Sequence, residues 1–118
     1  MQFSASVPIY LQVMDDIKRG IVSGALPPGG RVESVRVLAA RYGINLNTMQ
    51  RACAELEREG LIETRRGVGS FVTEDAARLS AARERLAAEL TEEFLARMSG
   101  LGFTRAEVRA RLEEEGEA

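Results

Sequence analysis

The sequence of 118 residues contains no histidine, and it has one cysteine and one lysine. Without histidine, neither a Ser-His-Asp triad, nor a Cys-His dyad, nor a zinc site with histidine ligands can form. The single cysteine, Cys53, cannot form a disulfide within the chain, which suits a reducing compartment. The single lysine, Lys18, stands between Asp15 and Arg19 in an amphipathic segment. We therefore interpret it as a solvated charge and not as a nucleophile.

Long apolar runs are also missing. No stretch of about 18 apolar residues occurs, so a membrane span is excluded. The first residues lack the basic region and long apolar stretch of a signal peptide, and we expect a cytoplasmic protein. The glutamates 113–115 are consecutive and point in different directions, so they are interpreted as a solvated face and not as a metal site. We expect no cofactor, no metal and no catalytic residue.

The charge is distributed unevenly along the chain. The net charge of −2 does not by itself favour a nucleic-acid partner, because strong binders are usually basic. Residues 31–73 nevertheless contain seven arginines against five glutamates, whereas residues 76–118 contain seven arginines against nine glutamates. This distribution permits DNA binding by the first region and argues against it in the second.

Two amphipathic helices are expected in the first third of the chain. Pro8 suits a first helical turn, and apolar residues at every fourth position of 9–21 predict a helix that ends at Gly24. The segment 27–30, Pro-Pro-Gly-Gly, is expected to interrupt regular secondary structure. A second helix is then expected between a capping Ser34 and Gly43.

A third helix follows after a very short turn. Asn45 can cap it, its apolar stripe includes Met49, Cys53 and Leu56, and Gly60 stops it. Two helices joined by a short turn that contains glycine form the signature of a helix-turn-helix. Cys53 lies on the buried stripe, and we interpret it as a small core residue; the alternative is a redox sensor.

Residues 61–72 contain two strand-like runs around Gly67 and Gly69, which predict a β-hairpin. The order of helix, helix-turn-helix and hairpin is that of a winged helix. We therefore predict a mainly α fold with a small β-hairpin: a winged helix-turn-helix DNA-binding domain over residues 1–75, followed by a C-terminal two-helix dimerisation segment over residues 76–118.

The segment after residue 75 is rich in Ala, Glu and Arg and predicts a long helix that breaks at residues 99–102. Thr104 and Glu107 match a capping box that begins a last helix. Two helices with one apolar face cannot bury that face alone, so either the winged domain or a second copy of the chain must cover it. We favour a two-fold homodimer. The residues expected at this contact are Leu79, Leu86, Leu90, Phe94, Met98, Val108 and Leu112.

Several short stretches, in order and at matching spacing, carry a resemblance to a known family. They are residues 8–12, 24–29, 34–39, 47–49, 59–62 and 67–72, together with Ala52 and Leu56. Through them, residues 8–73 resemble the DNA-binding domain of the GntR family of bacterial transcription regulators. The short tail and residues 45–52 resemble the YtrA-like subfamily. Two departures are Val32-Glu33, where the family often has Leu-Pro, and Leu46, where many members have arginine.

This resemblance implies a repressor that binds a palindromic operator in double-stranded DNA as a homodimer. In the YtrA-like subfamily the tail is a dimerisation element and the regulated genes often encode membrane transporters. No large effector domain is visible in the sequence. The sequence identifies no small-molecule effector, although it is compatible with a ligand at the dimer interface or at the junction between the domains.

The expected DNA-binding residues come from three places. Arg36 matches the family's DNA-contacting arginine, and its guanidinium suits phosphate or guanine; the alternative is a solvated surface charge. Asn or Gln at the front of the third helix can pair with adenine, although Asn47 or Thr48 could instead cap that helix. Arginines before the hairpin turn can reach phosphates or the minor groove, or can be mere surface charges. The expected set is Ser34, Arg36, Asn45, Asn47, Thr48, Gln50, Arg51, Arg65, Arg66 and Gly67.

Two other classes of function compete with this interpretation. A winged helix can serve as a protein-interaction module, but the expected exposed side chains of the third helix are polar and the wing carries arginines. An enzyme is the weakest alternative, because the sequence has no histidine and no catalytic motif, and its short domains leave little room for a pocket.

Overall fold

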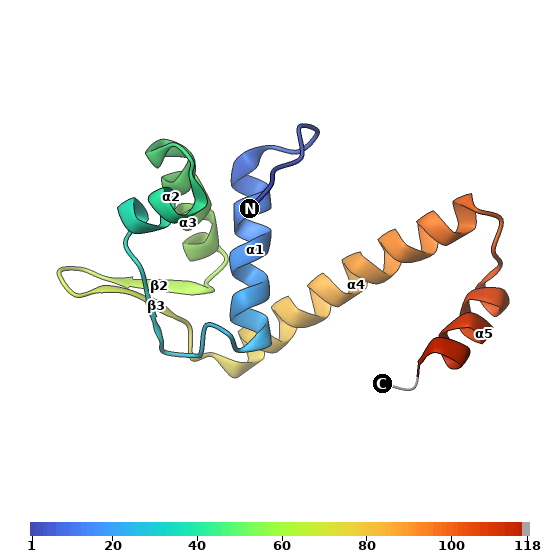
Figure 1. Cartoon of the computed structure of the whole chain (residues 1–118). Helices are drawn as coiled ribbons and strands as arrows, with labels where there is room; N and C mark the ends of the chain where they lie inside the picture. Colours follow the sequence, from blue (N-terminus) through green and yellow to red (C-terminus); the bar gives the residue numbers. More distant parts are fainter. Residues whose placement is uncertain (117–118) are drawn as a thin grey trace. The chain divides into compact units, whose positions relative to one another are not determined.

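The computed structural model describes residues 1–116 as helices joined by loops and short strands (Figure 1). The elements, in chain order, are α1 (Ile9–Ser23), β1 (Arg31–Val32), α2 (Val35–Tyr42), α3 (Leu46–Arg58), β2 (Ile62–Arg65), β3 (Gly69–Val72), α4 (Ala76–Gly100) and α5 (Arg105–Glu115). They divide into two units, Met1–Arg83 and a second unit that begins at Glu84. The winged helix-turn-helix predicted from the sequence is confirmed in the first unit.

Side-chain caps determine where the two helices of the helix-turn-helix begin. The Ser34 hydroxyl accepts the Val37 N–H at 3.2 Å at the start of α2, and the Asn45 side-chain oxygen accepts the Asn47 N–H at 2.7 Å at the start of α3. Gly43 ends α2 in the left-handed conformation (φ 67°), which glycine adopts without strain. These caps confirm the predicted boundaries and leave a turn too short to let α2 and α3 move independently.

The wing is part of a three-stranded sheet in the order β1-β3-β2, with both pairings antiparallel. The predicted hairpin is β2–β3. Strand β1 was not predicted; it places Val32 opposite Ser70 on the free edge of β3. The Gly29 N–H donates to the Val72 carbonyl at 2.9 Å, and the Val72 N–H donates to the Gly30 carbonyl at 2.9 Å. The loop before α2 is thereby attached to the base of the wing.

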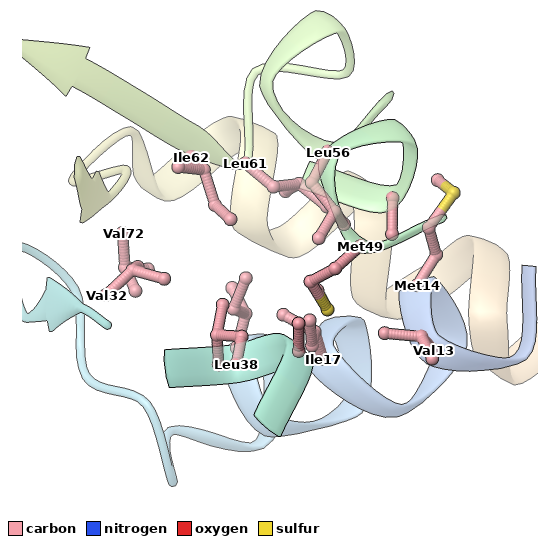
Figure 2. Packing of buried hydrophobic residues seen from close by; sticks show 13 residues of the cluster. Val13, Met14, Ile17, Val32, Leu38, Met49, Leu56, Leu61, Ile62 and Val72 are labelled. Carbon is pink, nitrogen blue, oxygen red and sulfur yellow. The ribbon is translucent and has the colours of Figure 1, made fainter. Parts of the chain in front are cut away.

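The core of the first unit lies where α1, α2, α3 and the sheet meet (Figure 2). Met49, Ala52 and Leu56 of α3 are completely buried. The buried cluster as a whole consists of Val13, Met14, Ile17, Ile21, Val32, Leu38, Ala39, Met49, Ala52, Leu56, Leu61, Ile62 and Val72. Because one face of α3 is fully used in this core, its opposite face is presented to solvent.

Two polar contacts fasten α1 to the helix-turn-helix. The Tyr42 hydroxyl at the end of α2 donates to an Asp16 carboxylate oxygen at 2.7 Å. Burial raises the pKa of Tyr42, and the hydrogen bond to Asp16 raises this pKa further. Lys18 forms an ion pair with Glu59 at 2.7 Å, just after α3. Both contacts fix the direction of α2 and α3 relative to α1.

A buried threonine sets the start of α4. Thr73 has no exposed surface; its hydroxyl donates to Glu63 at 3.3 Å and accepts the Asp75 N–H at 3.1 Å. The Asp75 carboxylate then accepts the Arg78 N–H at 3.1 Å and caps α4. The first turns of α4 therefore belong to the first unit, and Leu79 packs against its core cluster.

The second unit contains the rest of α4 and α5. The predicted capping box is confirmed: the Thr104 hydroxyl accepts the Glu107 N–H at 3.1 Å, and the Glu107 carboxylate accepts the Thr104 N–H at 3.0 Å. The bond from the Thr104 backbone lowers the pKa of Glu107. Within residues 84–116, Val108 is the one buried hydrophobic residue.

Candidate nucleic-acid interface

The exposed face of α3 is polar at its N-terminal end. Asn47 and Gln50 are exposed and Thr48 is half-buried. Asn45 is the N-cap of α3, so neither Asn47 nor Thr48 caps this helix. With about 100° between successive residues, Gln50 and Arg51 lie on opposite sides of Asn47. The face thus offers amide groups that can pair with base edges.

The first turn of α2 carries two further expected contacts. Ser34 accepts the Val37 N–H through its oxygen, and its hydroxyl proton can still be donated to a phosphate. Arg36 is exposed in the same turn. The neighbouring carboxylate of Glu33 is engaged with Arg41 at 2.6 Å. The free N–H groups of the helix start and an arginine side chain together suit an anion.

The wing presents arginines around an aromatic ring. Arg65 of β2 lies with its guanidinium carbon 4.5 Å from the centre of the Phe71 ring, and that of Arg31 lies 5.8 Å from the same ring. Arg31 also donates to the Val68 carbonyl at 2.7 Å. Arg66 and Gly67 occupy the exposed turn, where the positive φ of Gly67 (76°) favours glycine. Sequence reasoning missed Arg31 because it lies outside every predicted element.

Arg51 is placed differently from the other expected contacts. Its guanidinium carbon lies 3.9 Å from the centre of the Tyr10 ring on α1, and its Nη2 donates to the Tyr10 hydroxyl at 3.2 Å. Tyr10 was not among the expected site residues. No local pattern indicates a pairing between residues 41 positions apart.

Cys53 faces inward from α3 and is half-buried. Burial raises the pKa of the Cys53 thiol, and the nearby Glu57 carboxylate raises it further. The thiol is therefore protonated near neutral pH, and the reactive thiolate is disfavoured. These properties are those of a small core residue.

The residues expected at a dimer contact fall into three groups by burial. Leu79 and Val108 are used within their own units, while Leu86 and Met98 are half-buried. Leu90, Phe94 and Leu112 are exposed by 53%, 41% and 53%. Leu101, exposed by 73%, was missed because the sequence around it was interpreted only as a helix breaker.

Two further findings concern membrane-spanning helices and clusters of metal ligands. None of the helices in residues 1–116 is both long and apolar enough to cross a membrane. Within the same residues, no group of three or more potential metal ligands comes together.

A helix-turn-helix with a polar outer face, beside a wing with exposed arginines, defines the class of winged DNA-binding modules. Comparison with known families agrees: residues 9–72 match the family model described as bacterial regulatory proteins, gntR family. This match covers α1 through β3, the complete winged helix.

Similar proteins extend the comparison. The HTH-type transcriptional regulator YhcF of Bacillus subtilis strain 168 is 42% identical over 107 residues, which cover 91% of this chain and 88% of YhcF. The HTH-type transcriptional repressor YtrA of the same strain is 44% identical over 72 residues, covering 61% of this chain and 55% of YtrA. Among solved structures, a GntR family transcriptional regulator from Listeria monocytogenes is 39% identical, with a TM-score of 0.85 over 95% of this chain and 98% of that one.

The chain belongs to the gntR family of bacterial regulatory proteins, whose members are DNA-binding transcriptional regulators. The matches to YtrA and YhcF confirm the predicted affiliation with the YtrA-like subfamily. The relatives it resembles are transcriptional regulators and not enzymes.

Proposed function

We propose that this protein is a repressor that binds a palindromic operator as a homodimer. The observation that carries the proposal is the polar, solvent-facing end of α3, flanked by Arg36 and by the wing arginines. The names of two relatives, YtrA and NagR of Bacillus subtilis, describe repressors. A further solved structure, described as AraR(DBD) in complex with operator ORR3, is 27% identical over 62% of this chain, with a TM-score of 0.55.

DNA binding is assigned to residues 1–75. In this assignment α3 enters the major groove, and Asn47 and Gln50 pair with base edges. Thr48 and the Asn45 amide group lie beside them at the start of the helix. Ser34, Arg36, Arg65, Arg66 and the backbone N–H of Gly67 contact phosphates, which hold the protein in register on the duplex.

Dimerisation is assigned to residues 76–118. The exposed side chains of Leu90, Phe94 and Leu112 need cover from another apolar surface, and a second copy supplies it with two-fold symmetry. Leu101 joins this set because it is the most exposed of them. Two copies would place two α3 helices in successive major grooves, about 34 Å apart along the DNA. Leu86 and Met98 flank the contact, whereas Leu79 and Val108 support it from within their own units.

The controlled genes and the location of the protein rest on the family resemblance. We assign the protein to the cytoplasm and its regulated genes to membrane transport, as in the YtrA-like subfamily. A small-molecule effector is not part of this proposal.

Selection of bound duplexes from a random pool tests the function directly. We expect two inverted half-sites whose centres lie about 10 base pairs apart, or a multiple of this spacing. Asn47→Ala or Gln50→Ala should cost about 1–3 kcal/mol on the selected duplex and little on a scrambled one. Titrations of both duplexes measure this difference. Selection of unrelated sequences, or of a single half-site, would contradict the proposed palindrome.

The contacts to phosphate have a different signature. Arg36→Ala and Arg66→Ala should weaken binding to both duplexes and reduce the magnitude of the salt slope by about one unit each. Arg109→Ala is the matched control, because Arg109 is also exposed but lies on α5 in the second unit. Unchanged binding by both first-unit variants would show that another surface binds the DNA.

A further inference from the structure

We propose that Tyr10 and Arg51 form a preorganised phosphate clamp, in which Tyr10 holds the Arg51 guanidinium ready to bind the DNA backbone on the α1 side of α3. Arg51 then grips the duplex and does not read bases. The inference rests on the proposed function, DNA binding by α3. It also gives Tyr10, a residue of α1, a positioning role in recognition.

The geometry of the pair has two components. The guanidinium carbon of Arg51 lies 3.9 Å from the centre of the Tyr10 ring, well inside the range of a cation–π contact. The Arg51 Nη2 also donates to the Tyr10 hydroxyl at 3.2 Å. A planar guanidinium can stack on a ring and still present its other N–H groups to an acceptor, because it carries five donors.

Arg51 does not form a direct ion pair with a carboxylate in residues 1–116. Glu55, one turn further along α3, is hydrogen-bonded to Arg58, which is the main cause of the lowered pKa of Glu55; the charge of Arg51 lowers this pKa to a smaller extent. An exposed guanidinium held on a neutral ring is chemically suited to an anion, and on a DNA-binding face that anion is phosphate.

The position of Arg51 on α3 separates it from the residues expected to read bases. Asn47 lies at the middle of the exposed face, and Arg51 lies on the side that faces α1. Gln50 lies on the other side and lines a groove beside the sheet. When a helix lies in the major groove, its flanks approach the two sugar-phosphate backbones, so a guanidinium held toward α1 meets phosphate.

The advantage of the clamp is entropic. An arginine side chain has many rotamers, and ordering a rotamer-rich side chain on binding weakens affinity by about two- to tenfold. In this protein the ordering has already occurred in the free molecule, because Tyr10 is fixed in α1 and α1 is fastened to α2 and α3 through Tyr42 and Lys18.

The test measures binding of the full-length protein to a short mixed-sequence duplex between about 50 and 200 mM salt. Arg51→Gln should weaken binding and reduce the magnitude of the salt slope by about one unit. Tyr10→Leu should weaken binding about two- to tenfold without changing that slope, because the charge is still present. Tyr10→Phe keeps the stack and should bind within about twofold of wild type.

A double-mutant cycle decides whether the two residues act together. The double variant of Tyr10→Leu and Arg51→Gln should bind no more weakly than Arg51→Gln alone. Arg109→Gln is the matched control for Arg51→Gln, because it removes an exposed arginine from α5 in the second unit; it should leave DNA affinity unchanged. Circular dichroism checks that every variant is folded.

Three results would overturn the clamp while leaving the proposed function in place. They are additive losses in the double variant, unchanged binding by Tyr10→Leu, and a loss for Arg51→Gln on the selected operator alone, which would make Arg51 a base reader. If the wild-type protein binds neither the mixed duplex nor any selected one, the proposed function fails and the clamp with it.

Discussion

The two units of this chain differ in how they bury apolar surface. In the first unit, three helices and a sheet enclose a cluster in which several side chains have no exposed surface. In the second unit, Val108 alone is buried among residues 84–116, and Leu90, Phe94, Leu101 and Leu112 are exposed by 41–73%. Helices of both units begin at side-chain caps, so helix capping does not account for this difference in burial.

The difference shows that a helix can have a complete N-terminal cap and still leave its apolar side chains exposed. The Thr104–Glu107 capping box begins α5 as firmly as Ser34 begins α2. Leu90, Phe94 and Leu112 on α4 and α5 nevertheless remain exposed. The stability of the first unit should therefore be independent of protein concentration, whereas that of the second should rise with it if a second copy provides the cover.

The largest effect is expected from a substitution that creates a cavity in the core of the first unit. Leu56→Ala removes a fully buried side chain from α3 and should lower the free energy of unfolding by about 2–5 kcal/mol. Urea denaturation followed by circular dichroism measures the loss. Val68→Ala, at the exposed wing turn, is the control and should change stability by less than about 0.5 kcal/mol. Equal losses for both variants would mean that the core is not where this unit derives its stability.

The next effect tests the second unit. Phe94→Glu places a charge in the proposed contact and should cost about 2 kcal/mol or more of association, or about thirtyfold in the dimer Kd. Sedimentation equilibrium over a concentration series measures it. Arg85→Glu is a control on the same helix, about 180° away from Phe94. If the wild-type chain is monomeric at micromolar concentration, or if both variants dissociate equally, the proposed contact is wrong.

The smallest effect is expected from removing one helix cap, that of α5, and comparing α5 with α2. Thr104→Ala should cost about 1 kcal/mol, seen as faster amide exchange in α5 with little change in α2. Because the pKa of Glu107 is lowered in the folded state, its contribution is present above the ordinary glutamate pKa of about 4.3 and is lost as the pH falls through the lowered value. Glu107→Gln should abolish this acid dependence in α5. Persistence of the dependence would assign it to another carboxylate.

Most of the first unit could be predicted because its signals are local. Ser34, Asn45 and Gly43 mark helix ends through contacts with residues within four positions. Strand β1 could not be predicted in this way, because its two residues form a strand only by pairing with β3, almost forty positions away. The same limit explains why Arg31, which reaches the wing turn from β1, was missing from the expected site.

The expected site residues illustrate the same distinction. The exposed positions of Asn47, Gln50 and Arg36 follow from helical periodicity and are found in the structure. Periodicity also placed Arg51 on the exposed face, but its partner Tyr10 is on another helix and could not be inferred. In the tail, the apolar stripe did not reveal that Leu79 is used by the core of the first unit.

The ion pair between Lys18 and Glu59 makes the chemical reactivity of Lys18 a measure of whether α1 is docked on the helix-turn-helix. Lys18 is the only lysine; its side chain is only 21% exposed, and its amine forms an ion pair with Glu59 just after the end of α3. Apart from the N-terminal amine, a reagent that acylates amines can therefore modify only Lys18, and the ion pair must open before the Lys18 amine reacts. The rate of acylation at Lys18 then measures how often α1 separates from the helix-turn-helix, and DNA that stabilises their docking should slow this reaction.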